Sequence, residues 1–163
     1  MVLKILKFPN PLLRKKSKPV KKVTREIVKL IDHMVETMHA APGVGLAAPQ
    51  VGELVRVIVA EVGGELIALV NPEIIEKSGS QTFTEGCLCL PGVEAPVERA
   101  KKVVVKGLNR YGEKVKIEAE DLLATVLQHE IDHLDGVLFI DRVKDPSLIR
   151  KVSVKKEKRE ELI

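Results

Sequence analysis

The stretch from residue 120 to residue 134 predicts a helix that is apolar on two faces. Leu122 and Val126 share one face at helical spacing, and another face carries Leu123, Leu127, Ile131 and Leu134. A helix that is apolar on two faces is usually buried, so other elements of the fold must cover it. Gly136 follows where a left-handed residue is expected to close the helix. The sequence therefore favours a fold built around a buried helix at this position.

The same helix carries ionisable residues in the sequence His129-Glu130-Ile131-Asp132-His133. Four residues advance a helix by about 400°, so His129 and His133 lie one turn apart and can hold one metal ion between them. Glu130 lies at the flank of the same face. Short motifs of this form also arise by chance, but two imidazoles beside a carboxylate on a buried helix are costly unless a partner uses them. The pattern predicts a metal site.

A third metal ligand is needed, because a catalytic centre of the zinc type takes three protein ligands and leaves one position for water. The two cysteines of the chain lie in the stretch EGCLCLPG, and in an extended segment Cys87 and Cys89 would point the same way. One thiol would complete a Cys-His-His set, whereas both would close the site and make it structural. A downstream carboxylate such as Glu157 would suit a zincin-type peptidase, but it lies in a charged tail.

Residues 24 to 39 predict a second helix, with Thr24 as its cap. Its apolar residues follow helical spacing and are interpreted as one core-facing stripe: Ile27, Leu30, Ile31, Met34, Val35 and Met38. His33 and His39 belong to this helix or its end. Each is interpreted as an ordinary surface or satisfied histidine rather than a metal ligand.

Two β-hairpins are predicted from runs rich in β-branched residues. The first joins residues 55–62 to 65–70 through Gly63-Gly64, and the second joins 100–108 to 113–120 around residues 109–112. The predicted fold class is α+β, with antiparallel β-sheets packed around a central buried helix carrying HExxH, plus a C-terminal helix. Residues 1–163 are expected to form a single domain, with about 145–163 as a charged tail or helix.

Charge and composition exclude several function classes. The 27 Lys and Arg residues exceed the 23 Asp and Glu residues by only +4, which is too little to indicate nucleic-acid binding. Three Phe, one Tyr and no Trp supply almost no aromatic platform for a single strand. No apolar run approaches the roughly 18 residues of a membrane span, and the N-terminal stretch does not resemble a signal peptide. We expect a cytoplasmic protein, where sparse cysteines are more often ligands or nucleophiles than disulfides.

Three stretches together resemble the motifs of the peptide deformylase family. They are GVGLAAPQ at 43–50, EGCLC at 85–89 and QHEIDHLDG at 128–136, in the family's order, and the similarity runs through essentially the whole chain. The resemblance implies that Cys87, His129 and His133 are the metal ligands. Where the family usually carries Ser at the end of EGCLS, this chain has Cys89, which is interpreted as a filler rather than a fourth ligand.

The resemblance also implies the reaction, which is removal of the formyl group from the N-terminal formyl-methionine of nascent polypeptides, with release of formate. A water activated by the metal would attack the formyl carbon, and Glu130 would accept its proton and pass it to the leaving amine. The developing oxyanion needs donors already in place. Similarity to the family assigns these to the Gln50 side-chain amide and the backbone N–H of Leu88.

Substrate-binding residues are implied by the same resemblance. Gly43 and Gly45 leave room for a peptide to approach the main chain, although a tight turn after the first helix would also explain them. The other positions that the resemblance places near the substrate are Val44, Gly86, Arg99, Leu122 and Val126. Core packing or an ordinary surface location would equally explain several of these. Glu85 and Asp132 are candidates to orient the imidazoles through their free ring nitrogens.

The identity of the metal and the function of the tail are predicted from the family. One divalent ion is expected, Fe(II) first, with Zn(II), Ni(II) or Co(II) as alternatives that the same ligands suit. The basic C-terminal tail is expected to make a weak ribosome contact, as in bacterial relatives. Neither a membrane nor a specific nucleic acid is predicted as a partner.

Two other functions fit parts of the pattern. A zincin-type metallopeptidase shares the helix and the glutamate but takes its third ligand downstream, so Cys87→Ala would leave its metal bound. A non-catalytic metal-binding module would close its coordination shell with Cys87, Cys89, His129 and His133, and Glu130→Gln would change nothing measurable in it.

Overall fold

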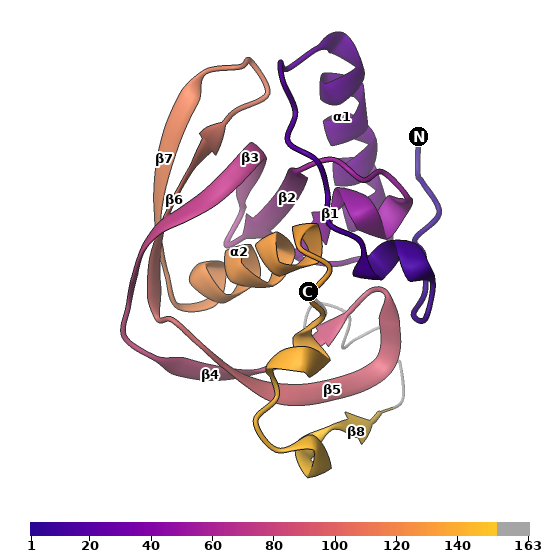
Figure 1. The fold of residues 1–163 in the computed structure, drawn as a ribbon, viewed down its shortest axis with the longest axis vertical. Coiled ribbons are helices and arrows are strands. Elements are labelled where there is room, and N and C mark those ends of the chain that lie inside the picture. Colours follow the sequence, from indigo (N-terminus) through magenta and orange to yellow (C-terminus); the bar gives the residue numbers. More distant parts are fainter. Residues whose placement is uncertain (153–163) are drawn as a thin grey trace.

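Residues 1–152, which this computed structural model describes, form two antiparallel sheets and two α-helices (Figure 1). The larger sheet has the strand order β1-β2-β3-β6-β7 and the smaller one the order β4-β5-β8. The elements are α1 (Arg25–Ala40), β1 (Gly45–Ala47), β2 (Val57–Val62), β3 (Glu65–Ser78), β4 (Gln81–Cys87), β5 (Leu90–Arg99), β6 (Lys102–Leu108), β7 (Lys114–Glu120), α2 (Asp121–Leu134) and β8 (Arg150–Lys151). The predicted α+β class with antiparallel sheets is confirmed.

The first helix, α1, begins where its cap predicts. The Thr24 hydroxyl accepts a hydrogen bond from the Ile27 N–H at 3.4 Å and so satisfies one of the free donors of the first turn. Ile31, Met34 and Met38 are fully buried, and they pack in one core cluster with residues of β1 and β2. The predicted apolar stripe is therefore a core face.

Both predicted hairpins are present in the larger sheet. β2 pairs with β3 through the Gly63-Gly64 turn, where both glycines have a positive φ, and β6 pairs with β7. β3 is longer than predicted, since it continues past Asn71 to Ser78. Asn71 has φ +54° at a shift in register, and its side-chain amide pairs with both backbone groups of Val20. This irregularity lets the strand pass Pro72 and pair with β6 beyond it.

The second helix, α2, is almost entirely buried beyond its first turn. It packs against β1, β2 and β7 of the larger sheet and against β4 of the smaller one (Figure 1). The helix ends before Gly136, which has φ +74° as predicted. A Cβ at Gly136 would lie 2.7 Å from the carbonyl carbon of Arg14, so close packing also requires glycine here.

The smaller sheet was not anticipated by the hairpin pattern. β4 and β5 pair over most of their length, and a two-residue turn, Leu88-Cys89, joins Cys87 to Leu90. β8 adds a short third strand by pairing with β5 at Val93 and Glu94. This sheet carries Glu85, Cys87 and Arg99 toward α2.

The N-terminal segment makes backbone hydrogen bonds to three regions that are far apart in the sequence. The Leu6 N–H donates to the Gln50 carbonyl, and the Phe8 N–H donates to the Cys89 carbonyl, each at 2.8 Å. The Ser17 N–H donates to the Leu134 carbonyl at 2.8 Å. These backbone bonds attach the segment to the stretch that carries Gln50, to the Leu88-Cys89 turn (the thiol turn) and to the end of α2.

The described part of the C-terminal tail is not an α-helix. Pro146–Leu148 forms a short 3-10 turn, and Arg150–Lys151 is the strand β8. Extended pairing with β5 takes the backbone groups that a helix would use. The rest of the predicted tail helix, residues 153–163, lies outside the described residues.

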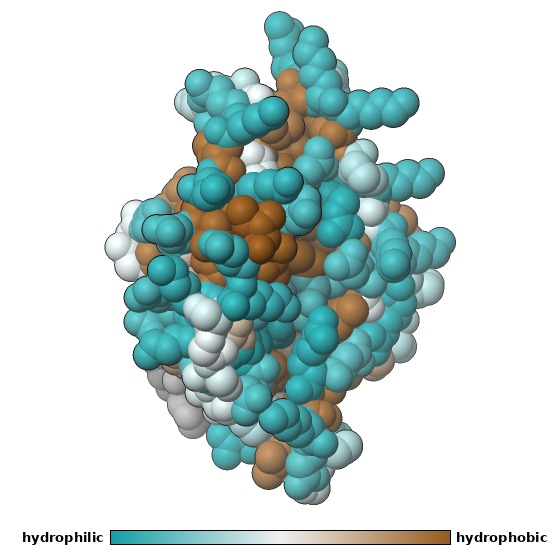
Figure 2. Space-filling view, turned by 60° about the vertical axis from the view of Figure 1, so that its left-hand side comes forward, coloured by the Kyte–Doolittle hydropathy of each residue, from teal (hydrophilic) through white to brown (hydrophobic). Residues whose placement is uncertain are grey.

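An apolar groove of about 460 Å³ opens where β3 meets β7 and α1, and Ile31, Val35, Leu66 and Val115 lie along it. Figure 2 shows apolar surface bordered by hydrophilic residues on this side of the molecule. Within residues 1–152, no helix combines the length and apolar character needed to cross a membrane.

Candidate metal centre

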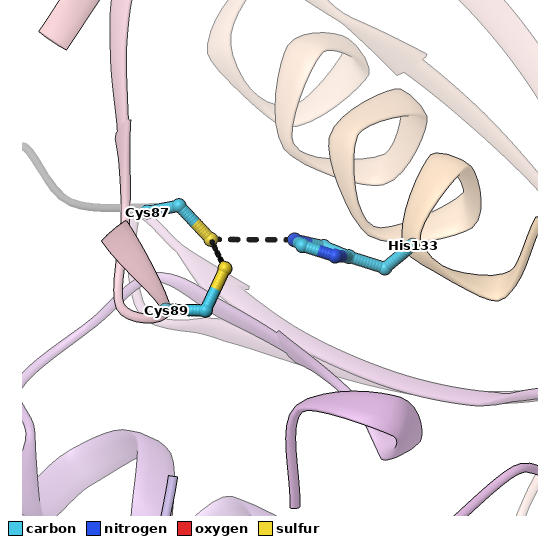
Figure 3. Close-up of side chains that lie close together, drawn as sticks. All are labelled: Cys87, Cys89 and His133. Carbon is cyan, nitrogen blue, oxygen red and sulfur yellow. Dashed lines mark hydrogen bonds between the residues drawn. The ribbon is translucent and has the colours of Figure 1, made fainter. Parts of the chain in front are cut away.

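The thiol turn between β4 and β5 places both sulfurs of the chain beside α2. Cys87 Sγ lies 3.2 Å from Cys89 Sγ and 3.3 Å from His133 Nε2. Figure 3 shows dashed lines from the Cys87 sulfur to both other side chains, and all three residues are buried. Metal–sulfur and metal–nitrogen bonds of about 2.3 and 2.0 Å put tetrahedral ligand atoms roughly 3.5 Å apart. The separation of Cys87 Sγ and His133 Nε2 is therefore close to what a shared ion requires.

The two imidazoles lie one helical turn apart on the buried face of α2. Their ring centroids are 5.0 Å apart, and the His129 ring stacks on Phe139. Possible ligand atoms form two groups, and within each group the atoms lie within 4.8 Å of one another. One group is Cys87, Cys89 and His133, and the other is His129, Glu130 and His133. Cys87 and His129 fall in different groups, and His133 belongs to both. His133 thus joins the thiol turn to the rest of the motif.

Several polar atoms at this place have no protein partner. Among residues 1–152, His129 Nε2, His133 Nδ1 and both carboxylate oxygens of Glu130 are buried without a hydrogen bond from the protein. Buried polar groups are nearly always satisfied, so such a cluster requires something else to bind. The donor set of thiolate and imidazole suits Zn, Fe or other transition metals. The residues present therefore fit a metal ion.

A paired charge network holds the opposite side of His129. His129 Nδ1 lies 2.8 Å from Glu85 Oε1, and the Arg99 guanidinium donates two bonds to the same carboxylate, at 2.7 and 3.0 Å. Arg99 Nη1 also donates to Asp132 at 2.9 Å, and Asp132 in turn accepts from Arg142. With Nδ1 engaged, the Nε2 atom of His129 is directed away from Glu85, as expected for a metal-ligating histidine.

Burial and neighbouring groups shift the pKa of Glu130, Cys87 and His133. Burial raises the pKa of Glu130 well above its ordinary value, and the nearby charges of Cys89 and Glu85 add to the rise. Burial likewise raises the pKa of the Cys87 thiol well above its ordinary value, with a further contribution from Cys89. Burial lowers the pKa of His133 well below its ordinary value. A neutral imidazole is the form that binds metal, and a coordinated cation deprotonates a thiol.

Glu85 differs from Glu130 in the direction of its shift. Burial alone would raise the pKa of Glu85, but hydrogen bonds from His129 and Arg99 outweigh burial and hold it below its ordinary value. The Glu85 carboxylate is therefore charged, and the buried Arg99 guanidinium provides the matching positive charge. The pKa of Glu85 is therefore lowered and that of Glu130, on α2, is raised, although both glutamates are buried.

Gln50 is fixed with its amide nitrogen toward the thiol turn. Its Oε1 accepts from the Ala47 N–H at 2.9 Å, and its Nε2 lies 3.4 Å from Cys87 Sγ. The bond to Ala47 settles which end of the amide faces the sulfur. Leu88 lies in the turn itself, and its carbonyl accepts from Lys7 Nζ at 3.0 Å.

The two glycines of the first motif pack against site residues. A Cβ on Gly45 would lie 3.0 Å from both Cγ and Cδ of Glu130 and would strike its Oε2. A Cβ on Gly43 would lie 2.9 Å from Cδ1 of Leu88. Glycine at residue 45 is therefore a condition for the position of the Glu130 carboxylate, a constraint that sequence reasoning did not identify.

The remaining predicted substrate residues have mixed surroundings. Val126 is fully buried in the core cluster that includes β2, while Val44 and Leu122 are partly buried against that cluster. Gly86 is buried in β4 next to Cys87. Arg99 is 8% exposed, and its hydrogen bonds go to Glu85 and Asp132. The structure thus gives Arg99 a role in the ion network, and contact of any of these residues with substrate stays a prediction.

The two candidate orienting residues differ in their contacts. Glu85 contacts an imidazole directly, whereas the bonds that the structure shows for Asp132 go to Arg99 and Arg142. The histidines of α1 lie away from the centre, and His39 pairs with Glu61 at 3.0 Å on the surface. Glu157, the alternative ligand, lies outside the described residues.

Comparison with known proteins gives a consistent result. The family model described as polypeptide deformylase matches residues 2–148. The peptide deformylase of Carboxydothermus hydrogenoformans is 54% identical over 150 residues, covering 92% of this chain and 97% of the relative. That of Halothermothrix orenii is 58% identical over 144 residues, covering 87% and 94%.

Solved structures show the same similarity in three dimensions. The crystal structure of peptide deformylase from Thermotoga maritima has a TM-score of 0.86 at 45% identity, covering 89% of this chain and 99% of that one. A peptide deformylase from Legionella pneumophila has a TM-score of 0.85 at 47% identity, covering 88% and 87%. Sequence and fold therefore agree over most of the length of both proteins.

Proposed function

The chain belongs to the polypeptide deformylase family and removes the formyl group from the N-terminal formyl-methionine of nascent polypeptides, and we propose how its own residues do this. Cys87, His129 and His133 hold the one metal ion on which the reaction depends, with α2 as the central helix of the site. The observation that carries this assignment is the cluster of buried, unpartnered atoms on α2 beside the Cys87 sulfur.

The ion, when bound, supplies Lewis acidity that activates water and polarises the formyl oxygen. We assign Fe(II) to the site, with Zn(II), Ni(II) or Co(II) as substitutes, because one thiolate and two imidazoles suit all of these. Cys89 is not a ligand in this assignment, so one position remains for the reacting water. That choice distinguishes a catalytic centre from a closed structural one.

Glu130 acts as the general base and then as the acid. Its carboxylate lies on the same helical face as the two imidazoles, with no bond from the protein in residues 1–152, so it is free to take a proton from water. Burial raises its pKa well above its ordinary value. A carboxyl group with a raised pKa can both accept a proton and return it to the leaving amine near neutral pH.

Gln50 and Leu88 stabilise the charge that develops on the formyl oxygen. Gln50 supports this role because its amide nitrogen is aimed at the thiol turn by the Ala47 bond. The backbone N–H of Leu88 belongs to the residue directly after Cys87. Donors that are fixed before reaction need no reorganisation as the charge forms.

The substrate is proposed to lie along the first motif. Gly43 and Gly45 border Leu88 and Glu130, so a peptide pairing with this stretch would pass the reacting groups. Val44, Gly86, Leu122 and Val126 are assigned to the side-chain pocket for methionine. Arg99 is proposed to lie near the substrate without binding it, since its guanidinium donates to Glu85 and Asp132.

Two further assignments rest on the substrate and on sequence. Nascent formylated polypeptides are made in the cytoplasm, so we place the protein there. The basic C-terminal tail, about residues 145–163, is assigned a weak ribosome contact through its Lys and Arg residues, and its residues 153–163 lie outside the described part of the chain. A truncation after Val143 that leaves ribosome co-sedimentation unchanged would contradict the contact.

The test combines metal analysis with rates. Protein purified without oxygen should contain one divalent ion per chain, iron in native preparations, and deformylation should rise in proportion to metal content. Cys87→Ala should lose both metal and activity. A zincin-type peptidase would instead retain its ion in Cys87→Ala, and activity without any bound ion would refute the proposal.

A further inference from the structure

The two thiols are closer than the proposed ligand set needs. Cys87 is the last residue of β4, and the two-residue turn folds the chain back so that Cys89 Sγ lies 3.2 Å from Cys87 Sγ. Figure 3 shows the two sulfurs facing each other. Both side chains have an exposed fraction of 0%. In the proposed function only Cys87 binds the metal, so the sulfur of Cys89 is left without a role.

The position of Cys89 is fixed by contacts outside the thiol pair. Its backbone carbonyl accepts from the Phe8 N–H at 2.8 Å, and the neighbouring Leu88 carbonyl accepts from Lys7 Nζ. Its side chain packs in a core cluster with Leu13, Leu138 and Phe139. The second sulfur is therefore held against the first by the fold.

We infer that Cys87 and Cys89 form a reversible disulfide when the protein meets a hydroperoxide, and that Cys89 serves as the resolving thiol for the metal-binding sulfur. The sulfurs must close from 3.2 Å to a bond of about 2.05 Å, which a small side-chain rotation in a two-residue turn can supply. That the bond releases the metal rests on the proposed function, whereas its formation does not.

The chemistry balances with hydrogen peroxide as the oxidant. The Cys87 sulfur attacks one peroxide oxygen, the O–O bond breaks, and a sulfenic acid and one water result. The Cys89 sulfur then attacks the Cys87 sulfur, the S–O bond breaks, and the departing hydroxide takes the Cys89 proton as a second water. Two thiols lose two electrons in total, and one peroxide becomes two waters.

The pair changes what oxidation does to the site. A sulfur in a disulfide is no longer a thiolate ligand, so the ion loses one of its three proposed partners. A single cysteine would continue to sulfinic and sulfonic acids, which cellular thiols do not reverse. Cys89 intercepts the sulfenic acid first, and a dithiol reductant then restores both thiols. Both cysteines have an exposed fraction of 0%, so hydrogen peroxide reaches the sulfurs through local opening of the chain.

The experiment uses Zn(II)-loaded protein, because Fe(II) would itself consume the oxidant, treated with three equivalents of hydrogen peroxide under argon. Intact mass after denaturation in an alkylating agent should show loss of about 2 Da and no alkylated thiol, with a peptide containing linked Cys87 and Cys89. Metal should appear in the filtrate. Dithiothreitol, removed before Zn(II) is added back, should restore most of the deformylation rate.

Cys89→Ser is the matched control, and each sample is compared with its own untreated activity. The treated variant should gain about 32 or 48 Da at Cys87 and should not recover with reductant. A wild-type protein that gains this mass instead, or equal recovery in both proteins, overturns the inference. Untreated Cys89→Ser that fails to hold metal also overturns it, because Cys89 would then be a ligand. Failure of the proposed function is read separately, as absence of metal in untreated wild type.

Discussion

Two sides of the polar stretch on α2 differ in how their atoms are paired. On one side, Glu85, Arg99, Asp132 and Arg142 form a continuous set of ion pairs around Nδ1 of His129. On the other side, His129 Nε2, His133 Nδ1 and Glu130 have no partner within residues 1–152. The paired side holds the His129 ring in place, and the unpaired side offers the atoms that the proposed metal ion and reacting water would use. The difference shows that burial alone does not define the site, since Glu85 on the paired side is as fully buried as Glu130 on the unpaired side.

The largest expected effect comes from the unpaired side. Glu130→Gln keeps the shape of the side chain but removes proton transfer, so deformylation should fall by about 10² to 10⁴. Metal content and the free energy of unfolding should not fall, because the carboxylate makes no protein hydrogen bond among residues 1–152. Steady-state rates and urea melts measure both. Glu61→Gln, a surface substitution, is the control and should keep full activity. Full activity in Glu130→Gln as well would show that proton transfer does not depend on the unpaired side.

The next effect comes from removing the buried cation of the paired side. Arg99→Met leaves the charged Glu85, which has an exposed fraction of 0%, without its guanidinium. The free energy of unfolding should fall by about 3 to 5 kcal/mol in urea melts. Adding Glu85→Gln to this variant should recover part of the loss. Arg110→Met breaks a more exposed pair with Asp32 and should cost far less; equal costs would show that burial of the pair is irrelevant.

A smaller effect is expected where the two sides meet. Glu85→Gln weakens the bond that orients His129 and should lower metal affinity by about 10-fold to 100-fold. Competition with a chelator measures the affinity directly. Asp132→Asn is the control, since the bonds that the structure shows for it go to arginines. If both variants lose affinity equally, the network acts through overall charge and not through the His129 bond.

The smallest effect should come from the outer end of the network. Arg142 is half-exposed, and its pair with Asp132 is screened by solvent. Arg142→Ala should change the free energy of unfolding by less than about 1 kcal/mol, with a smaller change in high salt. Urea melts at two ionic strengths provide the measurement. A loss of unfolding free energy as large as that of Arg99→Met would show that exposed and buried ion pairs of the network contribute equally to stability.

Periodic segments were predictable from the sequence because their signals are local. The apolar stripe of α1 with its Thr24 cap and the hairpin through Gly63-Gly64 match the structure closely. The smaller sheet was missed because β5 contains Pro91 and Pro96, which argue against a strand. β8 has only two residues and derives its conformation from pairing with β5.

The site was predictable in its chemistry but not in its supports. The spacing of His129 and His133 follows from helix geometry alone. The bond between Glu85 and His129 joins residues 44 apart, and Arg99 reaches Glu85 only because β4 and β5 are paired. No local pattern encodes these contacts. Glu85, the first residue of the EGCLC motif, was a candidate to orient an imidazole, but the sequence did not choose between His129 and His133. For Arg99, an arginine at the end of a strand, the sequence specified no carboxylate partner.

The ties made by the N-terminal segment have a consequence for biosynthesis. Leu6, Phe8 and Ser17 are translated early, but their backbone partners are Gln50, Cys89 and Leu134. The opening residues must therefore wait outside the exit tunnel until most of the polypeptide has followed them. Until Cys89 has been translated, Phe8 cannot donate its hydrogen bond to the turn that carries the two sulfurs. The N-terminal segment can be fully attached only after Leu134 has left the ribosome, so growing polypeptides are trimmed by copies of the enzyme that were translated earlier.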